Sequence, residues 1–367
     1  MMPELRVLFL VEGKEVPASR FRARQFFPEL ENRGIHCTLR YGYGTRYGEI
    51  SRTPLGSAYK LLSRSKRALL GLEALRHDVV FFQRTAIPHT AWPECALARL
   101  HPHTVFDFDD AIWLGPGGRD SRLRRRAFQQ AVGCCQWVVA GNEFLAREAA
   151  VPEKTTVLPT VIDTNRYRPA PRVNGVGRAD LVVGWMGTSP NLPYIEAVLP
   201  DVLEAVSSVA GARVRIVSNG RLEGYTNHPL VEQIPWSRQD EVALLQSFDV
   251  GLMPLPDSPL TRGKCGFKMI QYMAVGAAVV ASGVGANVEL FRGSGAGALV
   301  TPGESFREPV RALLTDPDAR ETAGARARAH AEANLSLPRV ADAYAEIFRR
   351  VAREPGFTTP GRPRPRR

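Results

Sequence analysis

The sequence is poor in cysteine and lysine. Its five cysteines are odd in number, and no two of them have the C-x-x-C spacing of a zinc ribbon or a redox pair. This pattern gives no sign of a disulfide framework or a structural zinc site, so we expect reduced thiols in a cytoplasmic protein. Lysine occurs only at positions 14, 60, 66, 154, 264 and 268, so arginine carries most of the basic charge.

Long apolar runs are also absent. No stretch reaches the roughly 18 apolar residues of a membrane-spanning helix, and the best candidate, 273–286, contains three glycines. The short run 5–11 is followed by Glu12, Gly13 and Lys14 and by no small-residue cleavage site, which favours a buried first strand over a signal peptide. We therefore expect a cytoplasmic protein, with peripheral contact at the inner face of the membrane left open.

The charge balance does not by itself select a partner. A formal net charge of +11 suits nucleic acid, anionic lipid or a polyphosphate substrate. The chain shows no arginine-aromatic platform, so we expect no nucleic-acid partner. Near 57–75, basic residues interleave with leucines in a helical pattern that suits an anionic membrane surface, with ordinary packing as the alternative. The basic residues of this stretch are Lys60, Arg64, Lys66 and Arg67.

Short apolar runs alternate with amphipathic stretches in both halves of the chain. The runs that predict strands are 6–11, 37–41, 78–83, 104–108 and 137–140, and then 181–186, 213–217, 250–253, 278–281 and 297–301. Predicted helices lie between them at 19–33, 57–75, 92–100, 119–132, 191–208, 239–247 and 267–275. Such alternation predicts an α/β fold with two Rossmann-like parallel sheets. We place the domains at 1–165 and 181–337, with a linker at 166–180, a C-terminal helix at 338–355 and a disordered basic tail at 356–367.

One segment of the second half carries the strongest functional signal. It reads Lys264-Cys265-Gly266-Phe267-Lys268-Met269-Ile270-Gln271-Tyr272-Met273-Ala274-Val275-Gly276 and precedes a small apolar run. Basic residues at the start of a helix suit a phosphate. The segment resembles the donor-nucleotide segment of GT-B glycosyltransferases of the retaining group called family 4, and residues 251–255 and 285–289 extend the resemblance.

The resemblance implies two domains that face a cleft, with the C-terminal helix returning to the first. It also implies a nucleotide-diphosphate-sugar as substrate and no obligatory cofactor. Lys268 would be catalytic by stabilising the departing diphosphate, helped by Lys264, while Gln271 would bind ribose and Glu289 would approach the donor sugar. For the two lysines, solvated loop or helix-cap residues are the alternative.

Two further donor-binding stretches are expected in the second domain. A strand-to-helix turn that contains Gly184, Gly187 and Thr188 suits backbone contacts to a diphosphate. A tight turn without a ligand is the alternative. Trp236 suits a loop that faces the base, or a buried domain junction. The family has glutamates where Gln271 and Gly263 stand here, and their loss leaves a degenerate, inactive member as an alternative.

Acidic residues end a predicted strand of the first domain. Asp109 and Asp110 follow 104–108, and ligands gather at such strand ends. Asp-x-Asp alone suggests the metal site of GT-A enzymes, but the donor-like segment lies far downstream in a second sheet. We therefore predict no metal and assign both aspartates to catalysis, orienting the acceptor; caps of the next turn are the alternative.

The acceptor side is completed by a glycine and three arginines. Gly13, Arg20, Arg22 and Arg84 are predicted to bind the acceptor, with Ser19 as the N-cap of the helix that carries Arg20 and Arg22. Those two arginines suit an anionic acceptor or the donor phosphates, or else a solvated first turn.

Together these features predict transfer of a sugar to a glycan, lipid-linked or small-molecule acceptor, with retention, in cell-envelope or glycan biosynthesis. A non-catalytic or degenerate GT-B protein that binds a sugar nucleotide or a membrane surface remains the alternative from another class.

Overall fold

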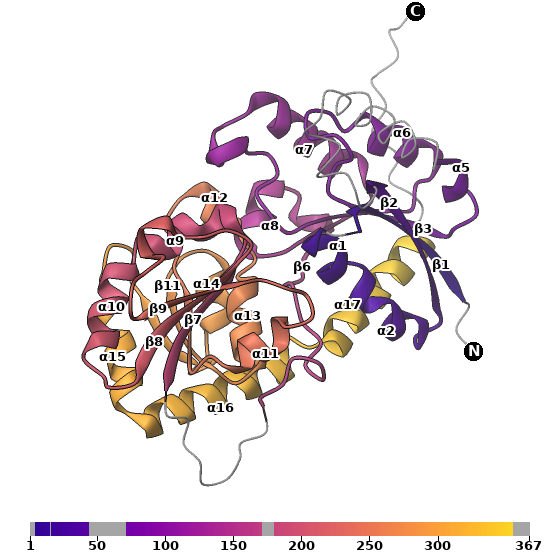
Figure 1. The fold of residues 1–367 in the computed structure, drawn as a ribbon. Helices are drawn as coiled ribbons and strands as arrows, with labels where there is room; N and C mark the ends of the chain where they lie inside the picture. Colours follow the sequence, from indigo (N-terminus) through magenta and orange to yellow (C-terminus); the bar gives the residue numbers. More distant parts are fainter. Residues whose placement is uncertain (1–3, 15, 44–70, 171–179, 355–367) are drawn as a thin grey trace, which may run out of the picture. The chain divides into compact units, whose positions relative to one another are not determined.

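The computed structural model describes residues 4–14, 16–43, 71–170 and 180–354 (Figure 1). It divides into two compact units: unit 1 comprises Met1–Thr160 and Leu337–Arg367, and unit 2 comprises Val161–Ser336. Three predicted features lie outside the described residues. They are 57–70 of the basic helix with Lys60, Arg64, Lys66 and Arg67, residues 171–179 of the linker, and the tail 356–367.

Unit 1 contains a six-stranded sheet in the order β2-β1-β3-β4-β5-β6. All neighbouring strands are parallel, and every residue of β3, β4 and β5 is buried, as expected for a sheet covered on both faces. The strands are β1 (Leu5–Gly13), β2 (Ile35–Tyr43), β3 (Val79–Gln83), β4 (Thr104–Phe108), β5 (Trp137–Ala140) and β6 (Thr155–Val157). The helical elements are α1 (Pro17–Phe21), η1 (Arg24–Phe26), α2 (Phe27–Glu31), α5 (Gly71–Ala74), α6 (Trp92–Leu100), η2 (Pro116–Gly118), α7 (Arg122–Cys134), α8 (Glu143–Ala149), η3 (Pro152–Lys154) and α17 (Leu337–Arg353).

Unit 2 contains a second six-stranded parallel sheet in the order β12-β11-β10-β7-β8-β9. Its strands are β7 (Leu181–Gly187), β8 (Ala212–Ser218), β9 (Val231–Pro235), β10 (Val250–Met253), β11 (Ala278–Ser282) and β12 (Gly297–Val300). Its helical elements are η4 (Ser189–Asn191), α9 (Leu192–Glu196), α10 (Leu199–Ser207), η5 (Glu223–Tyr225), α11 (Glu241–Gln246), α12 (Pro259–Arg262), α13 (Phe267–Ala274), α14 (Ala286–Phe291), α15 (Arg307–Thr315) and α16 (Pro317–Asn334). The predicted plan of two parallel sheets is confirmed.

The helix predicted at 19–33 is divided into three short pieces. The chain leaves helical geometry at Ala23, with φ of −134° and ψ of −75°, while Pro17 and Pro28 occupy the first turns of α1 and α2, a position that suits proline. The prediction that Ser19 is an N-cap is therefore wrong. The N-cap is Val16, and Ser19 lies buried inside α1.

Two edge strands were not predicted. β6 pairs with β5, and β9 pairs with β8 along Val231–Pro235. Both are short, and none of the residues of β6 is fully buried. Edge strands of this kind lack the continuous apolar run that marks the central strands.

The C-terminal helix α17 completes the core of unit 1, as predicted. Its Tyr344 and Phe348 rings pack against Phe81 of β3, with ring centroids 5.9 and 6.1 Å away, and Phe348 also contacts Phe9 of β1 at 5.7 Å. Phe348 of the last helix thus fills the same core as Phe9 of the first strand. Among the helices that the structure describes, none is long and apolar enough to cross a bilayer.

A buried ion pair fastens α17 and α1 to the sheet. The guanidinium of Arg22 donates from Nε to Oδ2 of Asp107 at 3.1 Å and from Nη2 to its Oδ1, while Nη1 donates to the Leu158 carbonyl at 2.7 Å. The Tyr344 hydroxyl donates to Asp107 Oδ1 at 3.0 Å. Because both charged side chains are buried, each depends on the other for compensation.

We expect Arg22→Met to destabilise unit 1 by about 3–5 kcal/mol, because it leaves the Asp107 carboxylate buried without its partner. Tyr344→Phe should cost only about 1–2 kcal/mol, because Asp107 keeps Arg22. Denaturant unfolding measures both.

Arg6→Met is the matched control, since the Arg6–Asp78 pair is exposed and its loss should cost less than about 1 kcal/mol. An Arg22→Met variant no less stable than Arg6→Met would contradict this account.

Candidate active site

Each sheet has a point at which the strand order reverses. In unit 1 the chain leaves β1 toward β2 and returns to β3 on the other side, and in unit 2 β7 and β10 flank the equivalent point. Loops leave the carboxyl ends of such strands in opposite directions and open a crevice where ligands of α/β sheets bind.

In unit 2, Tyr272 fixes α13 beside this point. Its hydroxyl accepts a hydrogen bond from the Met186 N–H of β7 at 3.1 Å. Its ring lies directly over Gly251 of β10, where an added Cβ would come within 2.4 Å of the ring. One side chain therefore sets the height of α13 over both strands that flank the reversal.

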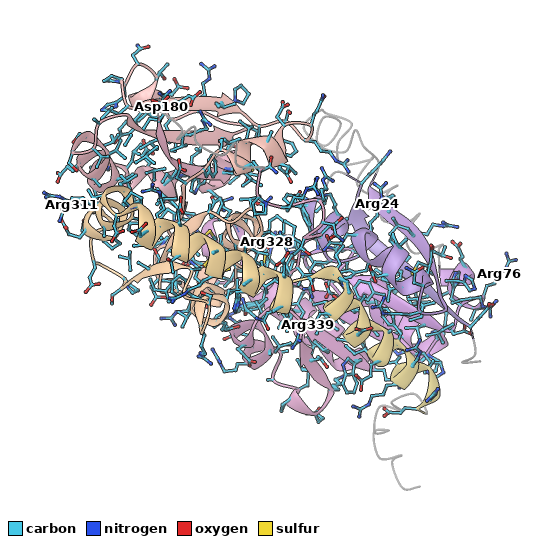
Figure 2. All side chains as sticks on the ribbon, turned by 90° about the horizontal axis from the view of Figure 1, so that it is seen from below. Arg24, Arg76, Asp180, Arg311, Arg328 and Arg339 are labelled. Atoms are coloured by element: carbon cyan, nitrogen blue, oxygen red, sulfur yellow. The ribbon has the colours of Figure 1, made fainter. Side chains whose placement is uncertain are left out.

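Arg328 of α16, labelled in Figure 2, holds the last turn of the same helix. Its Nη1 donates to the Ala274 carbonyl in the last turn of α13 at 2.6 Å and to the Tyr167 carbonyl at 2.7 Å. A cation at the helix C-terminus also complements the helix dipole. The N-terminus of α13 is thus held at the carboxyl edge of the sheet.

The structure brings two predicted donor-binding residues together, Lys268 and Gly187. The Lys268 ammonium lies 5.5 Å from the centroid of the Trp185 ring, and an added Cβ at Gly187 would lie 2.7 Å from Lys268 Cε and 2.6 Å from the ring. The absence of a side chain at Gly187 therefore leaves the space that Lys268 occupies. The first N–H groups of α13, which have no partner within the helix, lie in the same turn as this lysine.

The remaining donor-side predictions divide into edge and core positions. Thr188 is exposed just after β7, and its Oγ1 accepts from Asn191 Nδ2 at 2.8 Å. Lys264 lies in the loop before α13, with its ammonium 5.9 Å from the Tyr194 centroid, and Glu289 is half-buried on α14. Gly184 instead lies in the middle of β7, where an added Cβ would meet the Phe248 ring at 2.1 Å, so packing explains this glycine.

Gln271 and Trp236 meet at a third residue, Glu241. The Trp236 indole N–H donates to Glu241 Oε2 at 3.2 Å, and Gln271 Nε2 lies 3.5 Å from Oε1. Gln271 is almost fully buried, whereas 40% of Trp236 is exposed. The predicted base-facing and ribose-facing residues are therefore neighbours.

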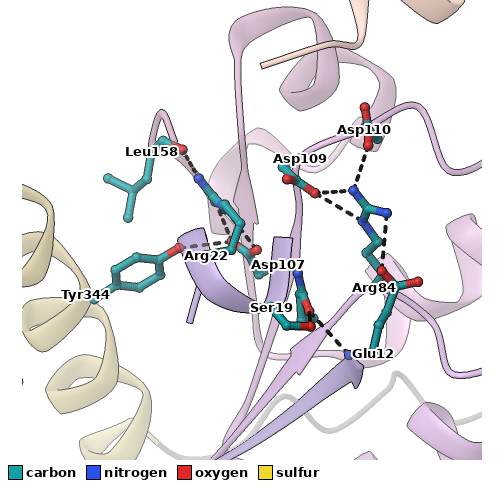
Figure 3. Close-up of polar contacts among 10 residues, drawn as sticks. Glu12, Ser19, Arg22, Arg84, Asp107, Asp109, Asp110, Leu158 and Tyr344 are labelled. Atoms are coloured by element: carbon teal, nitrogen blue, oxygen red, sulfur yellow. Dashed lines mark hydrogen bonds and ion pairs between the residues drawn. The ribbon is translucent and has the colours of Figure 1, made fainter. Parts of the chain in front are cut away.

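In unit 1, Arg84 gathers three carboxylates at the reversal between β1 and β3 (Figure 3). Its Nη2 donates to Asp109 Oδ1 and to Asp110 Oδ2, each at 2.6 Å, and Nη1 lies 3.3 Å from Glu12 Oε2. Three carboxylates thus surround one guanidinium. Among these four side chains the carboxylates outnumber the guanidinium.

Arg84 has a left-handed backbone, with φ of 58°. This conformation is costly for a residue with a Cβ and persists only where its surroundings impose it. Here the Arg84 N–H donates to the Asp107 carbonyl at 2.8 Å, and the carboxylates hold the side chain. Burial alone would raise the pKa of Asp109, but the positive charges of Arg84 and Arg22 outweigh it and hold that pKa below its usual value.

The other acceptor-side predictions are placed differently. Gly13 ends β1, and its N–H donates to Ser19 Oγ at 3.3 Å, so the glycine belongs to this edge. Arg20 is half-buried on α1, with its guanidinium carbon 4.1 Å from the Phe21 centroid. Arg22 belongs to the core, because only 1% of it is exposed and Asp107 pairs with it.

Three polar residues at these edges were missed by sequence reasoning. They are Glu12 beside Arg84, Glu241 beside Gln271, and Asn287, whose Nδ2 donates to the Ser282 carbonyl at 3.0 Å and so links α14 to the end of β11. Glu12 could have been found, because it stands near the end of the first strand. The other two depend on contacts between distant residues. Within the described ranges no group of three or more His, Cys, Asp or Glu is arranged to hold a metal ion.

Comparison with known proteins follows this division of the chain. Residues 181–316 match the family model for glycosyl transferases group 1. No curated relative matches the chain. HepE of Anabaena, solved with UDP and glucose, superposes with a TM-score of 0.70 at 16% identity over 95% of this chain and 100% of HepE.

Two further solved structures share the fold. Sucrose-phosphate synthase of Thermosynechococcus elongatus has a TM-score of 0.72 at 12% identity, covering 95% of this chain and 99% of its own. WaaG, a glycosyltransferase involved in lipopolysaccharide biosynthesis, has a TM-score of 0.64 at 14% identity, covering 93% and 99%. The predicted GT-B fold and the predicted resemblance to group 1 glycosyltransferases are confirmed.

The lowered pKa of Asp109 predicts how stability depends on pH. Its folded pKa lies below the unfolded value of about 3.9, so the ionised group contributes stability that is present above that value and is lost as pH falls through the folded pKa. We expect the difference in free energy of unfolding between wild type and Asp109→Asn to become smaller as pH is lowered from about 6 to about 3. Denaturant unfolding measures this difference.

Asp120→Asn is the control, because this aspartate is exposed and its distance to Arg125 is 3.4 Å. The free energy of unfolding of this variant should stay close to that of wild type at every pH. A difference for Asp109→Asn that stays constant or widens in acid would show that Arg84 does not stabilise the ionised form.

Proposed function

Since unit 2 carries the group 1 glycosyltransferase module and the whole chain has the GT-B fold, we propose that the protein transfers a sugar from a nucleotide-diphosphate-sugar to a hydroxyl-bearing acceptor. The observation that carries the proposal is the placement of Lys268 across Gly187, at the N-terminus of α13 and beside the strand reversal of unit 2. HepE has also been solved with UDP-glucose, which makes a UDP-sugar the first donor to test.

Lys268 would act on the leaving group. In the transfer step the bond between the anomeric carbon and the phosphate oxygen breaks, the acceptor oxygen bonds to that carbon, and the acceptor proton passes to a phosphate oxygen. Negative charge therefore accumulates on the diphosphate. A fixed ammonium and the backbone N–H groups of a helix start would stabilise this charge more in the transition state than in the bound donor. Lys264 lies in the loop before α13 and would add positive charge near the diphosphate.

The reaction would retain the anomeric configuration, with the departing phosphate taking the acceptor proton. The support is the resemblance of the 264–276 segment to the retaining group. Glu289, in the first turn of α14, would meet the donor sugar. Thr188 would contribute contacts to the diphosphate from the turn after β7.

Unit 1 would supply the acceptor side through Gly13, Arg84, Asp109 and Asp110. Arg84 is already paired with three carboxylates, and Arg22 is committed to the core, so these two described arginines do not form a cationic pocket for an anionic acceptor. The carboxylates suit hydroxyl donors instead. We propose a neutral, hydroxyl-rich acceptor moiety, oriented by Asp109 and Asp110. Cytoplasmic location and peripheral membrane contact stay predictions from the sequence.

Lys268→Ala should lower the transfer rate about 100-fold with a smaller effect on the KM for donor, because the lost interaction strengthens in the transition state. The donor nucleotide is first found by thermal shift with UDP, GDP, ADP, CDP and dTDP without metal, since a ligand of the folded state raises the midpoint. Transfer is then followed by release of that nucleoside diphosphate.

Arg311→Ala serves as the control, because Arg311 is an exposed residue of α15 paired with Glu308 and should leave the rate unchanged. Undiminished transfer by Lys268→Ala would remove this lysine from the mechanism. Nucleotide binding by wild type without any turnover would contradict the transferase and support a binding protein.

A further inference from the structure

Glu241 is a buried carboxylate of unit 2 that the proposed reaction does not use. It is the first residue of α11, and only 4% of it is exposed. Its Oε1 accepts a hydrogen bond from the Tyr167 hydroxyl and faces Gln271 Nε2 at 3.5 Å, while its Oε2 accepts from Trp236 Nε1 at 3.2 Å. Each of the three contacts offers the carboxylate an N–H or O–H donor, which is what an ionised carboxylate requires when it is buried.

This arrangement fixes the direction of the Gln271 amide. A carboxylate only accepts, so the amide nitrogen of Gln271 must face Glu241, and the carbonyl oxygen must point elsewhere. Reversing the amide would place two oxygens against each other in a buried site. Gln271 is therefore held as an acceptor toward any group that approaches from its other side.

The same carboxylate orients Trp236. The indole nitrogen is held by Glu241, while 40% of the residue is exposed just after the end of β9. An exposed aromatic face whose edge is fixed is a suitable stacking surface for a nucleobase. Glu241 thus links one predicted ribose contact and one predicted base contact.

We propose that Glu241 is the positioning residue for the donor nucleoside: it turns the Gln271 carbonyl toward a ribose hydroxyl and holds the Trp236 ring for the base. The inference rests on the proposed function, because it assumes a nucleotide donor in unit 2. It also gives a physical reason for glutamine at position 271. With a carboxylate already at 241, a second one at 271 would repel it, so this chain carries the carboxylate on α11 and the amide on α13.

Nucleotide binding should therefore tolerate an exchange of the carboxylate and the amide between positions 241 and 271, but not a carboxylate at both positions. In Glu241→Gln/Gln271→Glu, the new amide donates to the new carboxylate, its carbonyl accepts from Trp236, and Tyr167 adapts because a hydroxyl both donates and accepts. Net charge is unchanged by the double substitution. This exchange separates positioning from general packing.

The test measures nucleotide affinity at about pH 8.5 for wild type, both single variants and the double variant, by calorimetry. The probe is whichever of UDP, GDP, ADP, CDP and dTDP wild type binds most tightly. Gln271→Glu should weaken binding at least about tenfold, and the double variant should return to within about threefold of wild type, because facing carboxylates disfavour each other only in the single variant. Gln239→Glu, an exposed change two residues before Glu241, controls for added negative charge near the ligand.

A second readout isolates the ribose. Wild type should bind the 2′,3′-dideoxy analogue of the probe about tenfold more weakly than the probe itself, and Glu241→Gln should reduce that ratio toward one. Two results would overturn the role of Glu241. One is a double variant whose loss of affinity equals the product of the losses in the two single variants. The other is a ratio of probe to dideoxy affinity that is the same in Glu241→Gln as in wild type. Failure of wild type to bind any of the five nucleotides would instead remove the proposed function, and the inference with it.

Discussion

The position of α13 over β7 and β10 is the constraint on which the proposed donor site depends. Tyr272 is bonded to the Met186 N–H and rests on Gly251, and Arg328 holds the final turn through the Ala274 carbonyl. Because a helix moves as a rigid rod, these anchors determine where Lys268 lies at its other end. The motif residues of α13 thus divide by face: those that turn inward set the height of the helix, and Lys268, at its start, lies beside Gly187, where we propose that it meets the donor.

Pairing between charges decides which basic residues of unit 1 are available to a ligand. Arg22 follows the end of α1 and Arg84 the end of β3, yet Arg22 pairs with the buried Asp107 and Arg84 pairs with three carboxylates, Glu12, Asp109 and Asp110. A chain with a formal net charge of +11 thus gathers three carboxylates around one guanidinium at the strand reversal of unit 1. Local pairing, and not the overall charge, indicates the class of acceptor.

The periodicity of the sequence predicted both parallel sheets, because central strands are long apolar runs. The return of the last helix was implied by the family resemblance, and α17 lies in unit 1. Periodicity missed the edge strands β6 and β9, in which Val231 is the one buried residue. Motif reasoning predicted that Lys268 and Gly187 belong to one site, and they lie side by side. It also predicted that Gly184 and Arg22 bind ligands, whereas Gly184 packs against Phe248 and Arg22 pairs with Asp107. Glu241 was out of reach, because its role arises from contacts with Tyr167 and Gln271, 74 and 30 positions away.

Hydrogen–deuterium exchange with and without the bound nucleoside diphosphate tests the central claim most directly. The account predicts slower exchange at the amides of 187–191 and 264–269, since the backbone N–H groups at the start of α13 would bind phosphate oxygens. It predicts no comparable change at 12–22, 84 or 107–110, which belong to the acceptor side. Protection confined to unit 1, with the start of α13 exchanging as in the free protein, would contradict a donor site built on α13.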